Sequence, residues 1–448
     1  MQNFLTGYQV SDATWLYLSL VLILAVYFKF SRFWSLRNLD LLLLLLISPG
    51  VLMLRSGEQW HDRGTWWLMG VSALGVLRAL VDGLFVRRPR LEQNMNAAGM
   101  SFLTAATVVF LTTKLLTDPV QSETVRALSG AGVGASEAAI ATDLLTPGTE
   151  ATSGPTTALV KHAVDSISGA VLQQSPSAER QRGDVEIFTI RGLAILSHLA
   201  VIIGLTLVGR QVFGDPDLGF AMSSLYILMP CTAYDLGSVI QVLPAALVVW
   251  AIYCYRSPFV AGVLLGLASG ILFFPAFLLP VWWSFYGRRG GARFALAVGL
   301  TALLVVGMLW FVSRGGNELV ESTLGYVRWT SLQIWEDSRP QSFWGYLGPS
   351  WRLPLLVAFL MMVVATTIWP RPKSLAHLIP QSAAVVLGAQ LWYPQEGGVN
   401  VLWYLPLLLM VAFRPTMTNH QAPEITPLSG WFGGQLSRTS NPAESVRI

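Results

Sequence analysis

The sequence predicts an all-α membrane protein, a bundle of helices that crosses the bilayer many times. Apolar residues make up 53% of the 448-residue chain, charged residues make up only 12%, and the mean hydropathy is +0.54. Apolar windows of about 17–25 residues, the length that a bilayer requires, recur along nearly the whole chain. Short polar or basic breaks separate these windows, as is typical of loops between membrane-spanning helices.

The apolar windows predict about thirteen spans, an odd number, so the two termini are expected on opposite sides of the membrane. The predicted spans are 13–30, 38–54, 65–86, 99–117, 187–209, 217–232, 237–254, 258–273, 275–286, 294–313, 353–370, 376–392 and 399–413. Pro275 interrupts the region from 258 to 286, because proline removes an amide donor and clashes with the preceding turn. The two pieces around Pro275 are short enough to form one re-entrant hairpin.

Basic residues in the loops set the expected orientation. If loop 29–37 is cytoplasmic, alternation of the spans places nearly all loop lysines and arginines on that side. These residues are Lys29, Arg32, Arg37, Arg87, Arg88, Arg90, Arg210, Arg256, Arg288, Arg289, Arg293, Arg371, Lys373 and Arg414. The short loops of the other side contain only Arg55 and Arg63. We therefore expect a multi-pass protein of the inner (plasma) membrane, with the N-terminus outside and the C-terminus in the cytoplasm.

Two long loops and a polar tail divide the chain. We expect a four-span segment at 1–117, an extracytoplasmic loop at 118–186, a transmembrane core at 187–414 with an outer loop at 314–352, and a disordered cytoplasmic tail at 415–448. In the first loop, Ala158–Leu172 has apolar residues at helical spacing, which predicts an amphipathic helix on the membrane surface. The second loop is rich in aromatic residues, which are typical of an interfacial belt or of stacking against a sugar or lipid head group.

Charge and cysteine content exclude several classes of protein. The net charge of +4 and the pI near 9.1 come from loop arginines, so we expect membrane lipids and no nucleic acid as partners. Cys231 and Cys254 lie in or beside apolar spans and form neither a disulfide framework nor a metal motif. The P-loop, GxSxG, HExxH and CxxC motifs do not occur, so ATPase, hydrolase and redox functions have no support.

The breaks between the later spans follow a recognisable order. A polar turn at Tyr234–Ser238 is followed by an apolar helix, a basic loop, the helix Ala261–Ala268 (AGVLLGLA), Pro275 and the basic pair Arg288-Arg289. This order resembles the GT-C superfamily of integral-membrane glycosyltransferases, and within it the branch of polyprenol-phosphate-mannose-dependent mannosyltransferases. Asn400–Pro415 is similar to the last helix of that family, so the resemblance covers 217–415.

The resemblance implies a cell-envelope enzyme that transfers a sugar from a polyprenyl-phosphate donor to an extracytoplasmic lipid or glycan acceptor. It implies no nucleotide, and a divalent metal ion is the one cofactor that the family often uses. Family members often have a lysine before the proline of the helix break, where this chain has Phe274. Two alternatives stay open: a lipid or glycan transporter or flippase, and a non-catalytic GT-C-like scaffold, which the missing lysine favours.

Such a transfer requires a carboxylate that accepts a proton and a cation that holds the departing phosphate. The candidate bases are Asp118, Asp62 and Asp235. Asp118 precedes a proline and also fits a helix end, and Asp235 also fits a helix N-cap. Arg191 and His198 lie seven residues apart on the fifth span and are candidates for binding the donor phosphate, because ionisable groups inside a membrane are costly.

Further candidates lie in the predicted outer loops. Glu58 and His61, in loop 55–64, are candidate ligands of a divalent metal, although such a cluster is also typical of a solvated loop. Candidate contacts to the sugar or the acceptor are Tyr234, Trp329, Trp335 and Glu396. We expect Asp118, Arg191 and Asp235 to approach one outward-facing cavity.

One charged pair predicts a structural contact. Arg78 and Asp82 lie four residues apart in the third span, which places them on the same face of a helix. We expect these two side chains to pair with each other.

Overall fold

The computed structural model describes residues 11–85, 93–117, 154–171, 178–312, 344, 348–393, 400–417 and 420–422. Within these residues every regular element is a helix, and the only extended pairing is an isolated bridge between Ser374 and Gln421. The helices are α2 (Asp12–Tyr27), η1 (Phe30–Arg32), α3 (Leu36–Leu45), α4 (Ile47–Arg55), α5 (Glu58–Leu80), η2 (Val81–Leu84), α6 (Ala97–Thr117), α9 (Pro155–Val171), α10 (Ala178–Leu207), η3 (Val208–Val212), α11 (Pro216–Leu228), α12 (Pro230–Tyr234), α13 (Val239–Tyr253), α14 (Pro258–Ile271), η4 (Phe274–Phe277), α15 (Leu278–Val312), η6 (Pro349–Trp351), α18 (Arg352–Ile368), α19 (Leu375–Trp392) and α20 (Val401–Phe413).

Five helical stretches among the described residues are long and apolar enough to cross a membrane. They are Leu36–Arg55, Gln59–Leu84, Ala97–Thr117, Val185–Val212 and Gly290–Val312. The first joins α3 to α4, and the second joins α5 to η2. The helices α2, α13, α14, α18 and α20 are apolar but shorter. The all-α fold class and its membrane-spanning character therefore agree with the sequence.

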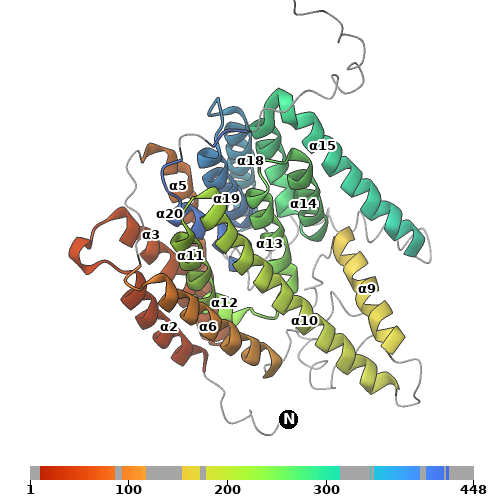
Figure 1. The fold of residues 1–448 in the computed structure, drawn as a ribbon, viewed down its shortest axis with the longest axis horizontal. Coiled ribbons are helices and arrows are strands. Elements are labelled where there is room, and N and C mark those ends of the chain that lie inside the picture. Colours follow the sequence, from red (N-terminus) through yellow and green to blue (C-terminus); the bar gives the residue numbers. More distant parts are fainter. Residues whose placement is uncertain are drawn as a thin grey trace, which may run out of the picture.

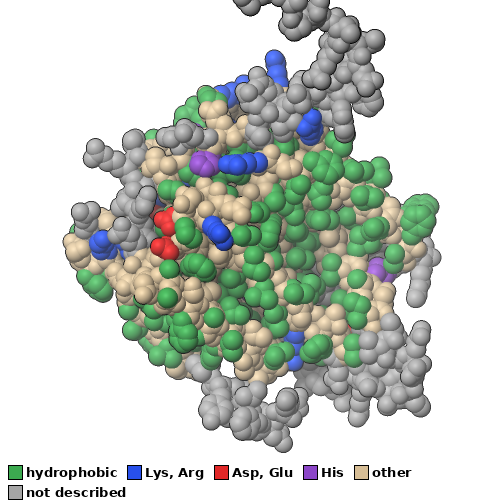
Figure 2. Space-filling view, in the orientation of Figure 1, with side chains coloured by type: hydrophobic (Ala, Val, Ile, Leu, Met, Phe, Trp, Pro, Cys, Tyr) green, Lys and Arg blue, Asp and Glu red, His purple; other side chains and the backbone are tan. Residues whose placement is uncertain are grey.

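The peripheral helices expose large apolar side chains. Only 22% of the most apolar window is buried in α6 and likewise in the second part of α15. Phe102 on α6 is 74% exposed, and Phe311 on α15 is 89% exposed. Hydrophobic side chains extend across the middle of the face that Figure 2 shows. Apolar surface of this extent indicates contact with lipid rather than with water.

The helices α19 and α20 form the centre of the bundle. They contact each other, α5 packs against α19, and α11 and α13 pack against α20 (Figure 1). Every residue from Val401 to Val411 is buried. A helix that is apolar on all sides can face either lipid or other helices, and α20 is enclosed by other helices.

The bundle has two ends, and the chain passes repeatedly from one to the other. The Asp12 end is defined by the start of α2, where Arg55 of α4 and Lys114 of α6 approach Asp12. The Asp82 end is defined by η2, where Arg414 after α20 contacts Asp82. Helix α2 runs from the Asp12 end, α3 and α4 return to it, α5 leaves it, and α6 returns again.

The predicted helix break at Pro275 is present. Helix α14 ends at Ile271, and a 3-10 turn, η4, precedes α15. Helix α15 bends sharply at Gly287, whose φ of 57° is accessible to glycine with little strain. The Tyr286 hydroxyl donates to the Tyr255 carbonyl at 2.8 Å, so α14 and the first part of α15 form a hairpin that returns to the end where it began.

A buried ion network joins three distant parts of the chain at the Asp82 end. The Arg78 guanidinium donates to Asp40 through Nε (2.5 Å) and Nη2 (2.7 Å), and to Asp82 through Nη1 (2.7 Å). Arg414 donates to the other oxygen of Asp82 through Nε (2.9 Å) and Nη2 (2.5 Å). The predicted pairing of Arg78 with Asp82 is confirmed, and the network extends it to α3 and to the segment after α20.

Two regions differ from the expectation in detail. Residues 158–171 of the predicted amphipathic helix lie in α9. Helix α9 was expected on the membrane surface, but it packs on α10, α14 and α15. Val164 is buried, and Ile167 remains 50% exposed. The predicted tail begins with a packed segment, in which Met417 is buried and the His420 carbonyl accepts from the Leu375 amide at 2.8 Å. Both segments acquire structure from partners that are distant in the sequence.

Candidate functional site

Charged side chains from α2, α4, α6 and the turn after α12 gather at the Asp12 end. Arg55 donates through Nη1 to Asp12 (3.4 Å) and through Nη2 to Asp235 (3.2 Å) and to the Tyr234 carbonyl (2.5 Å). Lys114 Nζ lies 3.5 Å from Asp12 and donates to the Ala233 carbonyl at 3.2 Å. The Tyr234 hydroxyl donates to the Asp12 carbonyl at 3.0 Å. We call Asp12, Arg55, Lys114, Tyr234 and Asp235 the Asp12 cluster.

Three members of the Asp12 cluster occupy the ends of apolar helices. Asp12 is the first residue of α2, after the N-cap Ser11, and its negative charge suits the positive end of the helix dipole. Arg55 is the last residue of α4, and Lys114 lies in the last turn of α6, where positive charge is favourable. Each apolar helix therefore ends in a residue that can remain in a polar environment.

The cluster is partly accessible. The side chains of Arg55 and Asp12 are 35% and 33% exposed, and those of Lys114 and Asp235 are 16% and 15% exposed. The Arg55 guanidinium bridges the carboxylates of Asp12, on α2, and of Asp235, in the turn after α12, and the Lys114 ammonium approaches Asp12. Such an arrangement combines a proton acceptor with cations that can bind an anionic group.

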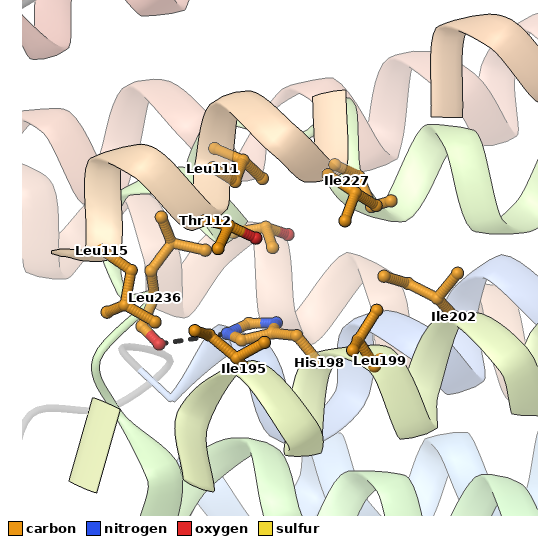
Figure 3. A pocket seen from close by; sticks show the side chains of 11 residues that line it. Leu111, Thr112, Leu115, Ile195, His198, Leu199, Ile202, Ile227 and Leu236 are labelled. Atoms are coloured by element: carbon orange, nitrogen blue, oxygen red, sulfur yellow. Dashed lines mark hydrogen bonds between the residues drawn. The ribbon is translucent and has the colours of Figure 1, made fainter. Parts of the chain in front are cut away.

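An apolar crevice lies beside the Asp12 cluster, between α6 and α10 (Figure 3). It encloses about 370 Å³ of empty space when the open space at its mouth is included. The lining residues are Val108, Leu111, Thr112, Leu115, Ile195, His198, Leu199, Ile202, Ile227, Thr232 and Leu236. Leu115 and Leu236 directly follow Lys114 and Asp235 in the sequence, so the crevice and the cluster adjoin.

His198 is buried in the floor of the crevice and has a protein partner on each ring nitrogen. Nε2 lies 3.2 Å from the Leu236 carbonyl, and Nδ1 lies 3.0 Å from the Tyr226 hydroxyl. A carbonyl only accepts, so Nε2 carries the proton, while Nδ1 of the neutral ring accepts from Tyr226. His198 therefore links α10 to α11 through Tyr226, and to the turn that holds Asp235 through the Leu236 carbonyl, the bond drawn in Figure 3. Its predicted role in binding phosphate would require one of these bonds to break.

The structure brings some of the predicted site residues together. Tyr234 and Asp235 belong to the Asp12 cluster, and His198 lies beside it in the crevice. Arg191 lies half-buried on α10, seven residues before His198. Asp118, Trp329, Trp335 and Glu396 lie outside the described residues. Their predicted roles, and the meeting of Asp118 and Arg191 with Asp235 in one cavity, stay predictions.

The predicted outer loop 55–64 is wrong in its extent. Helix α5 begins at Glu58, so His61 and Asp62 lie in its first two turns and only Ser56 and Gly57 separate α4 from α5. The Thr65 hydroxyl donates to the His61 carbonyl at 3.0 Å, as in a regular helix. The hydropathy pattern did not predict these first turns of α5, because they contain charged residues and hydropathy detects apolar residues rather than backbone hydrogen bonds.

A metal centre is not assembled within the described part of the chain. No group of three or more histidine, cysteine, aspartate or glutamate side chains there lies close enough together to hold a metal ion. The backbone of Glu58 is described but its side chain is not. The proposed metal ligands Glu58 and His61 therefore stay a prediction.

Sequence reasoning missed three members of the cluster, namely Asp12, Arg55 and Lys114. Arg55 is expected only as one of the few basic residues of the sparsely charged side, and the sequence assigns no role to Asp12 or Lys114. A usable signal was present: each is a charged residue at the end of a predicted span, and all three ends are predicted to face the same side of the membrane.

Comparisons with protein-family models, with curated proteins and with solved structures find no match to this chain.

Proposed function

We propose that this protein is a plasma-membrane glycosyltransferase that transfers a sugar from a polyprenyl-phosphate donor to an extracytoplasmic lipid or glycan acceptor. The observation that carries the proposal is the position of the Asp12 cluster beside the apolar crevice. A lipid-linked sugar phosphate combines a long apolar chain with an anionic head group. The two neighbouring surfaces offer a partner for each part.

Within this proposal Asp235 is the base, and Arg55 and Lys114 offset the negative charge of the phosphate. The acceptor oxygen forms a bond to the anomeric carbon of the sugar while the bond from that carbon to the phosphate oxygen breaks. The acceptor proton passes to Asp235, and the electron pair leaves with the polyprenyl phosphate. Asp12 holds Arg55 and Lys114 in place through its contacts with both.

The proposal requires the Asp12 end to be extracytoplasmic. The sequence predicts about thirteen spans with the N-terminus outside. In support, Arg55, Lys114 and Asp235, which lie at predicted outer span ends, share the Asp12 end. Arg414, from a predicted cytoplasmic loop, lies at the Asp82 end instead. A count that is wrong by an odd number of spans between these residues would have mixed the two sets.

Two matched serine-to-cysteine variants test this orientation. Ser56 and Ser31 are both exposed, but Ser56 directly follows α4 next to Arg55 at the Asp12 end, whereas Ser31 lies in η1, within the predicted cytoplasmic loop. In intact cells, Ser56→Cys should react with an impermeant thiol reagent and Ser31→Cys should react only after permeabilisation. The parent protein, whose cysteines are Cys231 and Cys254, gives the background. Reversed labelling would contradict the orientation and with it the proposed function.

The decisive experiment measures sugar transfer directly. Purified protein in proteoliposomes is given radiolabelled polyprenyl-phosphate sugars and a lipid extract of the producing cell as acceptor. Label should move to the acceptor, because the site pairs a base with cations for the leaving phosphate. Movement of the donor across the bilayer without transfer would instead indicate a flippase. If neither sugar transfer nor movement of the donor is detected, the result would favour the non-catalytic scaffold over the glycosyltransferase.

A further inference from the structure

The crevice between α6 and α10 opens towards the side of the bundle. Its walls are half-exposed side chains of the two helices, and its floor is formed by buried side chains of α6, α10, α11 and the α12 turn. The wall residues are Val108, Thr112, Ile195, Leu199 and Ile202. Neighbouring side chains outside the crevice are apolar and exposed, such as Leu196 at 64% and Ile203 at 49%. The opening therefore faces the same apolar surroundings as the peripheral helices.

The crevice suits a hydrocarbon chain. Most of its lining is aliphatic, and the polar groups of its floor already have partners. The Thr232 hydroxyl donates to the Tyr226 carbonyl at 2.7 Å, and both nitrogens of His198 have protein partners. An apolar ligand would leave no hydrogen bond unmade in this floor.

The charges at one end of the crevice specify the head group. Lys114 precedes the lining residue Leu115, and Arg55 contacts Asp235, which precedes the lining residue Leu236. A phosphate held by these two cations would place the first part of its attached chain at the entrance of the crevice. A neutral lipid would gain nothing from this position, whereas a phosphate gains charge-assisted hydrogen bonds.

We propose that the crevice between α6 and α10 binds the hydrocarbon chain of the polyprenyl-phosphate donor, which enters sideways from the bilayer with its phosphate towards Lys114 and Arg55. This inference rests on the proposed function for the identity of the donor. It adds the place and the direction of donor entry. His198, in the floor of the crevice, donates to the Leu236 carbonyl. The bound hydrocarbon chain would therefore lie against the turn that carries Asp235, the proposed base.

A photoaffinity probe tests the inference. The probe is a polyprenyl phosphate without a sugar that carries a diazirine on one of the isoprene units next to the phosphate. After irradiation of the protein in proteoliposomes, labelled peptides should come from α6 and α10. Excess unlabelled polyprenyl phosphate should abolish the labelling, and excess phosphatidylglycerol should not. Labelling elsewhere, or equal competition by phosphatidylglycerol, would overturn the assignment.

Two tryptophan variants on adjacent residues of α10 provide a matched comparison. Ile195→Trp fills the crevice, whereas Leu196→Trp adds the same side chain on the exposed side. Ile195→Trp should reduce probe labelling about tenfold or more, the factor that corresponds to a modest loss of affinity, and Leu196→Trp should leave it unchanged. Equal labelling of both variants would refute the site. If Ile195→Trp does not fold, Thr112→Trp on the opposite wall replaces it.

The two proposals can fail separately. Crevice labelling without sugar transfer under any donor would preserve the lipid site and refute the glycosyltransferase. Sugar transfer with probe labelling outside α6 and α10 would preserve the enzyme and refute the crevice as its donor site.

Discussion

Replacing Asp82 with alanine should destabilise the folded protein by about 3–5 kcal/mol, the usual cost of removing one partner from a buried ion pair. Asp82 is fully buried and accepts hydrogen bonds from both Arg78 and Arg414. In the four-residue network of Asp40, Arg78, Asp82 and Arg414, two negative charges balance two positive ones. Without Asp82, two buried guanidinium groups share one carboxylate. The free energy of unfolding in mixed detergent micelles measures the loss.

The second substitution in this experiment removes the excess charge. Adding Arg414→Ala to Asp82→Ala leaves Arg78 with Asp40 as a balanced pair, so part of the lost stability should return. Asp217→Ala, at an exposed aspartate in the first turn of α11, is the control and should lower stability by at most about 1 kcal/mol, the helix-dipole contribution of such a residue. If the double variant is less stable than Asp82→Ala, the cost does not come from uncompensated charge.

The sequence predicted the features that depend on neighbouring residues. Long apolar windows identified helices such as α6, because a bilayer imposes both length and composition. Pro275 identified the break before α15, since proline acts on its own turn. The spacing of Arg78 and Asp82 identified their contact, because residues four apart share a helix face. In each case the physical cause lies within one turn or one helix.

The sequence did not predict which helix ends meet. Arg414 and Asp82 are 332 positions apart, and Arg55 and Asp235 are 180 positions apart. Hydropathy fixes where a helix ends along its axis but contains no information on its lateral neighbours. The lateral neighbours are set by tertiary packing, such as the packing of α20 against α11, α13 and α19. For the same reason the Asp12 cluster could be anticipated only as separate charges on one side of the membrane.

Replacing Asp235 with asparagine should lower the rate of sugar transfer by about 10²–10⁴-fold, the usual contribution of a positioned base. Asparagine keeps the size of the side chain and can still accept from Arg55, but its amide cannot take the proton of the acceptor hydroxyl. Binding of the donor should change little, because the Arg55 and Lys114 cations remain. Initial rates and donor affinities are measured on the same proteoliposome preparation.

Two further aspartate variants show whether the effect belongs to this residue. Asp217→Asn, at the exposed start of α11, should leave transfer unchanged. Asp12→Asn should weaken donor binding more than it lowers the rate of sugar transfer from the bound donor. The reason is that Asp12 approaches both Arg55 and Lys114, the two cations proposed to hold the phosphate, while Asp235 contacts Arg55. If Asp12→Asn instead abolishes turnover and Asp235→Asn retains it, the base is Asp12. A base at Asp12 would place the acceptor hydroxyl at the start of α2, where the helix dipole would also stabilise its developing negative charge.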